Sequence, residues 1–274
     1  MMLRASLPMY DLPEVREWTD RLWRVIAEEL RAEELREAGL AGVPAALERP
    51  ADHHAAWRSD GLLFSQSCGY PVATALRGAV RVVATPHYAA PGCDGPRYSS
   101  VVVARAASHV TTPSELRGAV CAFNSRDSQS GYNALRRLIA PLARGGRFFA
   151  CAIETGAHAA SMEAVRRGRA DVCAVDCVTW ALCARYRPSM LTGLEVVGRT
   201  ASAPGLPFVT APDISDSTLG SIRSALARAF ARPDLAATRE ALLICGLSTL
   251  PTDAYDSLLD MERAAVASGY PHLD

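Results

Sequence analysis

Hydrophobic residues in the middle of the chain gather in short runs that are separated by amphipathic stretches. The runs are rich in Val, Ala, Cys and Phe and have the length of buried β-strands, whereas the stretches between them repeat apolar residues at helical spacing. Strands that alternate with helices in this way are typical of parallel β-sheets with helices packed on their faces. The pattern predicts strands at 119–123, 147–154, 170–176 and 193–199, and helices at 130–140, 158–167 and 177–186.

Towards both ends of the chain the same strand-like and helix-like patterns occur, but they alternate less regularly. A strand is expected at 3–9 and a long helix at 13–38, with Gly39 suited to its C-terminal cap. The apolar face of that helix consists of Trp18, Leu22, Val25, Ile26 and Leu30. Further strands are expected at 61–69, 78–88, 99–107 and within 200–212, and further helices at 215–231, 233–245 and 253–268.

Composition allows a sizeable core and excludes some classes of protein. The chain has 274 residues, of which 49% are hydrophobic, enough for one large domain or two lobes. Lys+Arg and Asp+Glu both number 29, so there is no electrostatic reason to expect a nucleic-acid partner. No run of about 18 apolar residues predicts a membrane span.

Cysteine usage indicates a reducing compartment and no metal ion. Most of the eight cysteines lie in apolar runs such as 119–123, 147–154 and 170–176. We interpret them as buried free thiols, because free cysteine packs as a small hydrophobic residue. Cys173 and Cys177 lack the short paired spacing of zinc ligands, and no histidine cluster accompanies them. We therefore expect neither a metal nor any other cofactor.

The stretch FNSRDSQSGYNALRRL, residues 123–138, concentrates small hydroxyl residues directly before a predicted helix. The first N–H groups of a helix have no partner within the helix and carry partial positive charge, so an anion can accept hydrogen bonds there. Ser128 and Ser130 would add hydroxyl donors to such a site. Gln129 would place an amide on its rim, and Gly131 would let the backbone approach closely. A serine that merely caps the helix explains the same residues equally well.

Three successive predicted strands end in polar residues that would meet at one edge of the sheet. The serine stretch follows 119–123, Glu154 and His158 follow the next strand, and Asp176 ends the third. Ligands of open α/β sheets bind at the carboxyl ends of the strands. His158 and Asp176 are, taken singly, equally plausible as helix-capping residues, but their convergence favours a ligand site.

Four segments of the chain resemble one branch of the periplasmic-binding-protein-like superfamily (type II), the substrate-binding proteins of phosphate/phosphonate ABC transporters. The resemblance lies in the S-x-S-G-Y loop and the G-x-H-x-x-S segment, and the matching segments are 62–71, 96–105, 116–136 and 156–176. It implies an α/β fold of two lobes joined by two crossing segments. It also implies a small-molecule binding protein whose lobes close on an anionic ligand, a phosphonate or phosphate-type compound.

The boundaries of the two lobes are predicted from where the regular alternation of strands and helices begins and ends. The regular series of strands and helices begins after Val103 and stops at Arg199, and a segment rich in Pro and Gly follows. We expect one lobe at 104–199 and a discontinuous lobe made of 1–103 and 200–274.

The resemblance implies roles for individual residues. Ser128, Gln129 and Ser130 match the family's phosphonate-gripping serine loop, in which the middle residue is more usually threonine. His158 matches a pocket histidine. Asp176 matches an acidic residue that can face the amine of aminoalkyl phosphonates, so Asp176 and Glu154 together suggest an aminated ligand. The candidates on the other lobe are Tyr10, Gln66, Ser67 and Tyr70, with Tyr88 and Tyr98 flanking the first crossing.

Two other functions remain open from the sequence. The same cleft could belong to an enzyme with His158 as general acid–base and Asp176 or Glu154 as its partner, although the sequence contains no G-x-S-x-G, H-E-x-x-H or Walker motif. An effector-sensing module is the other alternative. A transport role would require an ABC permease as partner and export from the cytoplasm. Because the chain shows no signal peptide at its start, the sequence predicts a cytoplasmic location, or a periplasmic one if a signal sequence is missing from this chain.

Overall fold

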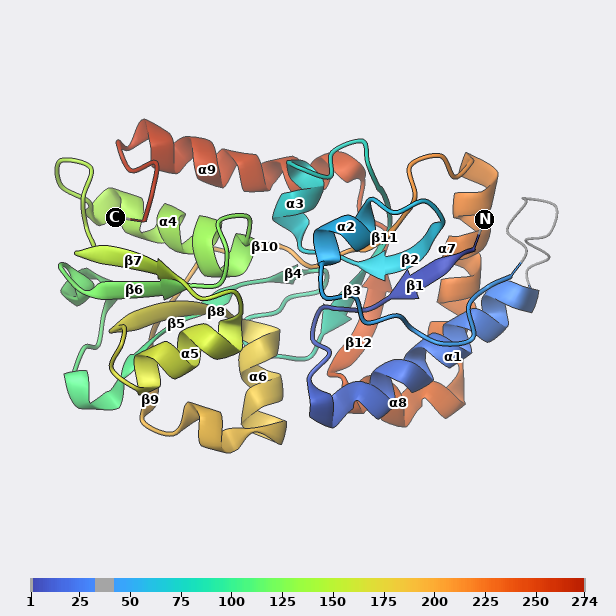
Figure 1. Ribbon diagram of the computed structural model, residues 1–274, viewed down its shortest axis with the longest axis horizontal. Helices are drawn as coiled ribbons and strands as arrows, with labels where there is room; N and C mark the ends of the chain where they lie inside the picture. Colours follow the sequence, from blue (N-terminus) through green and yellow to red (C-terminus); the bar gives the residue numbers. More distant parts are fainter. Residues whose placement is uncertain (1, 33–41, 274) are drawn as a thin grey trace. The chain divides into compact units, whose positions relative to one another are not determined.

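The computed structural model describes residues 2–32 and 42–273 and divides into two compact units (Figure 1). The first unit combines Met1–Ala89 with Gly205–Ala254, and the second combines Ala90–Pro204 with Tyr255–Asp274. The chain therefore passes between the units three times. The sequence predicted two passes and kept residues 200–274 together in the first lobe, whereas the structure returns the C-terminal segment to the second unit.

A five-stranded mixed sheet forms the centre of the first unit, in the order β1-β2-β11-β3-β12. β1 runs parallel to β2, and every other pairing in this sheet is antiparallel. The strands are β1 (Arg4–Ser6), β2 (Leu62–Gln66), β3 (Arg81–Tyr88), β11 (Phe208–Thr210) and β12 (Ile244–Ser248).

Aromatic side chains link the helices of the first unit to its sheet. Phe64 on β2 stacks on Trp23 of α1 at 5.8 Å between ring centroids and contacts Phe208 of β11 at 4.9 Å. Phe208 in turn contacts Phe230 of α7 at 6.4 Å. Large buried rings contribute much of a core's stability, so this column holds α1 and α7 to the sheet. The helices are α1 (Arg16–Ala32), α2 (His53–Trp57), α3 (Gly69–Ala73), α7 (Asp216–Ala231) and α8 (Ala236–Ala241).

The second unit contains a five-stranded sheet in the order β7-β6-β8-β5-β9. β6 runs parallel to both β7 and β8, as predicted, but β5 is antiparallel to β8 and to β9. A fully parallel sheet is therefore wrong for this unit. The strands are β5 (Ser100–Arg105), β6 (Val120–Phe123), β7 (Cys151–Glu154), β8 (Val172–Asp176) and β9 (Leu194–Arg199), beside a two-stranded sheet of β4 (Arg97–Tyr98) and β10 (Ala203–Pro204).

Helices cover both faces of the second unit's main sheet (Figure 1). α5 and α6 lie on one face, and α4 lies on the other, with α9 packed against it. These helices are α4 (Ala134–Ile139), α5 (His158–Arg166), α6 (Cys177–Tyr186) and α9 (Ser257–Ala267). A π-helix, η5 (Gln129–Asn133), leads into α4, and short 3₁₀ helices occur at 13–15, 106–108, 113–116, 140–142, 188–191, 233–235 and 252–256.

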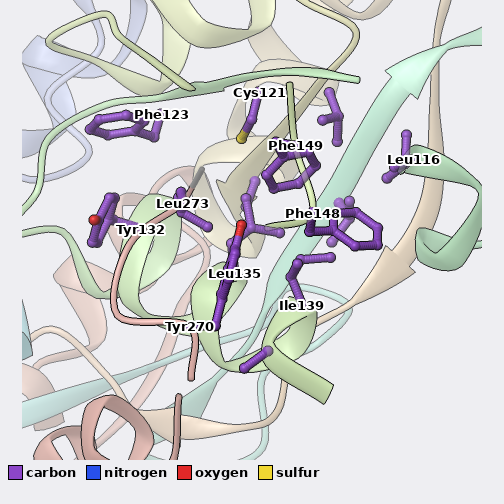
Figure 2. Packing of buried hydrophobic residues seen from close by; sticks show 14 of the residues in the cluster. Leu116, Cys121, Phe123, Tyr132, Leu135, Ile139, Phe148, Phe149, Tyr270 and Leu273 are labelled. Atoms are coloured by element: carbon purple, nitrogen blue, oxygen red, sulfur yellow. The ribbon is translucent and has the colours of Figure 1, made fainter. Parts of the chain in front are cut away.

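The core on the α4 face explains why the C-terminal segment belongs to the second unit. Figure 2 shows Tyr270 and Leu273 among the aromatic and aliphatic side chains of this cluster. Both are almost fully buried, and Arg136 of α4 donates a hydrogen bond from Nη1 to the Pro271 carbonyl at 2.8 Å. Burial of two large side chains against α4 fixes residues 255–273 here.

Most of the predicted elements are present, with two informative differences. The predicted helix 233–245 ends at Ala241, because Leu243 adopts a left-handed conformation (φ 58°) and the chain turns into β12. The helix predicted at 13–38 is described only from Arg16 to Ala32, and its expected cap Gly39 lies outside the described residues. No helix in the described part of the chain is both long and apolar enough to cross a membrane.

Candidate functional site

The carboxyl ends of three strands in the second unit meet at one edge. Phe123, the last residue of β6, is paired with Glu154, the last residue of β7, and β8 runs parallel on the other side of β6. The predicted convergence of these strand ends is therefore confirmed. Backbone bonds tie the loops beyond them together, since Thr155 donates its N–H to the Phe123 carbonyl at 2.9 Å and Gly156 donates to Asn124 at 2.8 Å.

The serine stretch forms a tight turn into a π-helix. Ser128 has an extended backbone and precedes η5, and its Oγ accepts the N–H of Gly131 at 3.0 Å. Its carbonyl accepts the N–H of Asn133 at 3.0 Å, which closes the wide π-type turn. Wide turns of this kind recur at functional sites. Ser128 is thus a helix cap, and it accepts the Gly131 N–H, one of the first N–H groups of this helical segment.

A short hydrogen bond joins the turn to the first residue of α5. Ser130 Oγ lies 2.8 Å from Nε2 of His158 and 3.4 Å from Ser128 Oγ. Burial lowers the pKa of His158 to about 4, although the Ala174 carbonyl opposes part of the shift. The imidazole is therefore neutral near pH 7. Its Nδ1 atom is shielded from solvent.

The close packing around Gly131 leaves no room for a side chain at this position. A Cβ atom at this position would lie 2.0 Å from Asn124 Oδ1 and 3.2 Å from His158 Cε1. The sequence expected the glycine to clear a path for a ligand, but the Asn124 side chain occupies that space. The Asn124 oxygen is itself buried without a hydrogen-bond partner in the described residues. Asn124 was missed by the sequence analysis, and its only signal was its place directly after a predicted strand.

The side chain of Gln129 does not lie on the rim. It is almost completely buried, its Oε1 accepts a hydrogen bond from Asn133 at 2.7 Å, and its Nε2 contacts Met261 Sδ of α9 at 3.1 Å. The amide that was expected on the rim is therefore buried in this structure. Gln129 instead ties the serine turn to the C-terminal helix.

The two carboxylates at the edge have different surroundings. Asp176 is buried, and its Oδ1 accepts the N–H groups of Val178 at 2.7 Å and Thr179 at 3.1 Å. This is helix capping, one of the two roles considered above. Glu154 is exposed at the end of the edge strand β7.

Three of the predicted residues of the first unit form a cluster of their own. Tyr10, in a left-handed conformation (φ 63°), packs edge-on against Tyr88 at 5.1 Å between ring centroids. Gln66 donates from Nε2 to the Tyr88 hydroxyl and to the Leu206 carbonyl, both at 3.1 Å. All three line a small hollow whose other walls include Leu22 and Phe208. The structure thus brings Tyr10, Gln66 and Tyr88 together.

The other predicted residues are not among those that line this hollow. Ser67 is fully buried, and its hydroxyl bonds to the Cys68 carbonyl at 3.1 Å. Tyr70 is buried at the start of α3, and Tyr98 is buried on β4, where it pairs with Ala203. In residues 2–32 and 42–273, no three His, Cys, Asp or Glu side chains gather as a metal ion would require.

Comparison with known proteins begins with a family described as "ABC transporter, phosphonate, periplasmic substrate-binding protein". The model of this family matches residues 22–250 of the chain. No curated protein sequence matches this chain.

Several solved structures share the fold. PhnD1 from Prochlorococcus marinus in complex with methylphosphonate is 14% identical, with a TM-score of 0.70, over 96% of this chain and 97% of that chain. A binding component of an ABC phosphonate transporter from Pseudomonas aeruginosa is 15% identical, with a TM-score of 0.72, over 97% and 88%. A Xanthomonas citri protein bound to ATP is 15% identical, with a TM-score of 0.71, over 97% of both chains. These matches confirm the two-lobe α/β fold of periplasmic binding proteins.

Proposed function

Because the chain belongs to the family of periplasmic substrate-binding proteins of phosphonate ABC transporters, we propose that it binds a phosphonate or phosphate-type anion and delivers it to an ABC permease. The family is a periplasmic one, and the proposal adopts that location among the two considered above. The observation that carries the proposal is the hydrogen-bonded group of Ser128, Ser130 and His158 at the strand edge.

The hydroxyls of Ser128 and Ser130 are the proposed donors to the anion. They lie 3.4 Å apart at the start of a continuous helical segment, where the helix contributes partial positive charge. Two oxygens of one phosphonate group can accept from both. Hydrogen bonds to a charged group each contribute about 1.5–3 kcal/mol, so two of them account for a substantial part of the affinity of a small ligand.

His158 controls which way the Ser130 hydroxyl points. A neutral imidazole carries one proton, and when that proton is on Nε2 the ring donates to Ser130 Oγ. The Ser130 hydrogen is then available to the ligand. An anion at Ser130 therefore favours the Nε2–H form of His158, which makes the histidine a positioning residue in this proposal.

The test of the serine site is the double variant Ser128→Ala with Ser130→Ala, titrated with methylphosphonate, 2-aminoethylphosphonate, inorganic phosphate and sulfate by calorimetry. We expect the wild-type chain to bind at least one of the phosphorus anions. The double variant should lose about two to four powers of ten in affinity for it, because two charge-assisted hydrogen bonds are gone.

Ser215→Ala is the matched control. Ser215 caps α7 of the first unit by accepting the Thr218 N–H at 3.1 Å, as Ser128 accepts from Gly131. Both changes cost about 1 kcal/mol as lost caps, but only the double variant should lose affinity. If the double variant binds like wild type, the serines are caps alone and the anion site lies elsewhere.

The carboxylates are proposed to select a ligand that also carries an amine. A carboxylate beside an oxyanion is repulsive unless a cation lies between them. Asp176→Asn keeps a good helix cap, so the fold should be retained. The variant should lower the affinity for 2-aminoethylphosphonate about tenfold or more and leave the affinity for methylphosphonate nearly unchanged. Calorimetric titration of both ligands measures the difference.

Glu154 lies at the exposed end of β7, and the variant Glu154→Gln distinguishes its role from that of Asp176. A selective loss in that variant alone would transfer the amine role to Glu154. Equal effects of Asp176→Asn on both ligands would reduce Asp176 to a cap.

A further inference from the structure

Two cysteines that the proposed function does not use have their sulfur atoms in contact. Cys93 and Cys177 are 84 positions apart in the sequence, and their Sγ atoms lie 3.5 Å apart. Both belong to the second unit. A disulfide bond is about 2.05 Å long, so the sulfurs would have to approach by only about 1.5 Å in total.

The backbone on the Cys93 side is held in place. The Cys93 N–H donates to the Ala90 carbonyl at 2.9 Å. Ser99 Oγ donates to the Gly92 carbonyl at 3.1 Å, and Arg199 Nη1 donates to the Pro91 carbonyl at 2.9 Å. These bonds fix the loop that carries Cys93.

The same loop packs directly on Cys177. Gly92 has a φ of 107°, and a Cβ atom there would come within 3.3 Å of Cys177 Cβ and even closer to Arg199 Nη1. Cys177 opens α6, directly after the capping residue Asp176, and donates its N–H to the Ser99 carbonyl at 3.1 Å. The fold therefore holds the two thiols next to each other, so little conformational entropy would be lost when a disulfide bond forms.

We propose that Cys93 and Cys177 form a disulfide bond in an oxidising compartment, and that this bond clasps the start of the second unit to the N-terminus of α6. The proposal does not rest on the identity of the ligand.

The chemistry is exchange with a small-molecule disulfide such as oxidised glutathione. Cys93 is partly exposed, whereas Cys177 is buried. As the Cys93 sulfur attacks the oxidant, its proton passes to solvent, a mixed disulfide forms and one glutathione thiolate leaves. Cys177 then loses its own proton to solvent and attacks Cys93 Sγ, which expels the second glutathione thiolate. Two protein thiols are oxidised, and one glutathione disulfide is reduced to two thiols.

In the reduced pair the hydrogen bond from Cys93 lowers the pKa of Cys177, and the same interaction raises the pKa of Cys93. That hydrogen bond is lost once Cys93 is in the mixed disulfide. In the second step the Ser99 backbone and Arg199 still lower the pKa of Cys177, whereas burial and Asp176 raise it.

The test uses the full chain with Cys151→Ser and Cys245→Ser, because these two cysteines are exposed and would confuse the result. After treatment with a glutathione redox buffer, the denatured protein is alkylated and weighed. We expect the number of alkylated cysteines to fall from six to four, and peptide mapping to join Cys93 to Cys177. The bond closes a long loop, so the thermal midpoint should rise by about 5–15 °C over the reduced form.

Cys93→Ser in the same background is the control. It retains Cys177 and the small polar side chain, and it should lose both the bridge and the gain in thermal midpoint. An alkylation count that stays at six, a bridge mapped to another pair, or an unchanged midpoint after bridging would each overturn the proposal.

Discussion

The hydrogen bond between Ser130 and His158 links the serine turn to α5 through two side chains that stand 28 positions apart in the sequence. The residue pattern predicted that Ser128, Ser130 and His158 would come together, because each follows a strand and parallel strands end at the same edge. The destination of the Gln129 side chain could not be predicted. Its partners Asn133 and Met261 come from a π-turn and from a distant helix, and neither leaves a periodic signal in the sequence.

His158 should make the stability of the protein depend on pH. Its pKa is about 4 in the folded chain and near 6.5 when unfolded, so the unfolded chain binds more protons between these values. The contribution is therefore fully present above about pH 6.5 and is lost as pH falls toward 4, by at most about 3 kcal/mol. Denaturant unfolding at several pH values measures it.

His158→Gln should reduce the change in the free energy of unfolding between pH 6.5 and 4, because glutamine does not titrate. The exposed His272→Gln serves as control and should keep the wild-type profile. If wild type and His158→Gln lose stability in parallel between pH 6.5 and 4, the histidine is not the group responsible.

At the scale of elements, the sequence was most informative where strands and helices are short and regular. α6 begins and ends at the residues that the pattern predicted, and β8 lies within its predicted range. β12 was missed because Leu242, Leu243 and Ile244 continue the apolar pattern of the preceding helix, and a positive φ at a leucine has no sequence signature. The direction of β5 was equally hidden, since the apolar content of a strand does not reveal whether its neighbours run parallel or antiparallel.

The C-terminal segment after α9 should be essential to the second unit. Leu273 is almost fully buried in the core cluster, whereas the adjacent His272 is exposed. Leu273→Ala should therefore lower the free energy of unfolding by about 2–4 kcal/mol, through lost burial and the cavity left behind. His272→Ala should change it by less than about 0.5 kcal/mol.

Equilibrium unfolding in urea measures both variants. Equal, small effects would mean that the end of the chain contributes nothing to the core, and the assignment of 255–274 to the second unit would then lose its energetic basis.

At the scale of the whole molecule, the family resemblance predicted the fold class, and the solved structures of similar fold confirm it. The boundaries of the units were harder to predict. Regular alternation begins at about Val103, but the second unit already starts at Ala90, because β4 pairs with β10 and β5 with β8. The return of the last segment depends on side-chain packing against α4, which no local pattern records.

The placement of Tyr270 and Leu273 in the core of the second unit has a consequence for biosynthesis. Protein chains emerge from the ribosome N-terminus first, and the first unit is incomplete until residues 205–254 have been made, whereas the second is incomplete until residues 255–273 have followed. Each core therefore waits for a segment that is synthesised after most of the other unit. A chain that has not yet reached Tyr270 and Leu273 leaves the apolar surface around Leu135 and Ile139 uncovered, which would expose it to quality-control proteases.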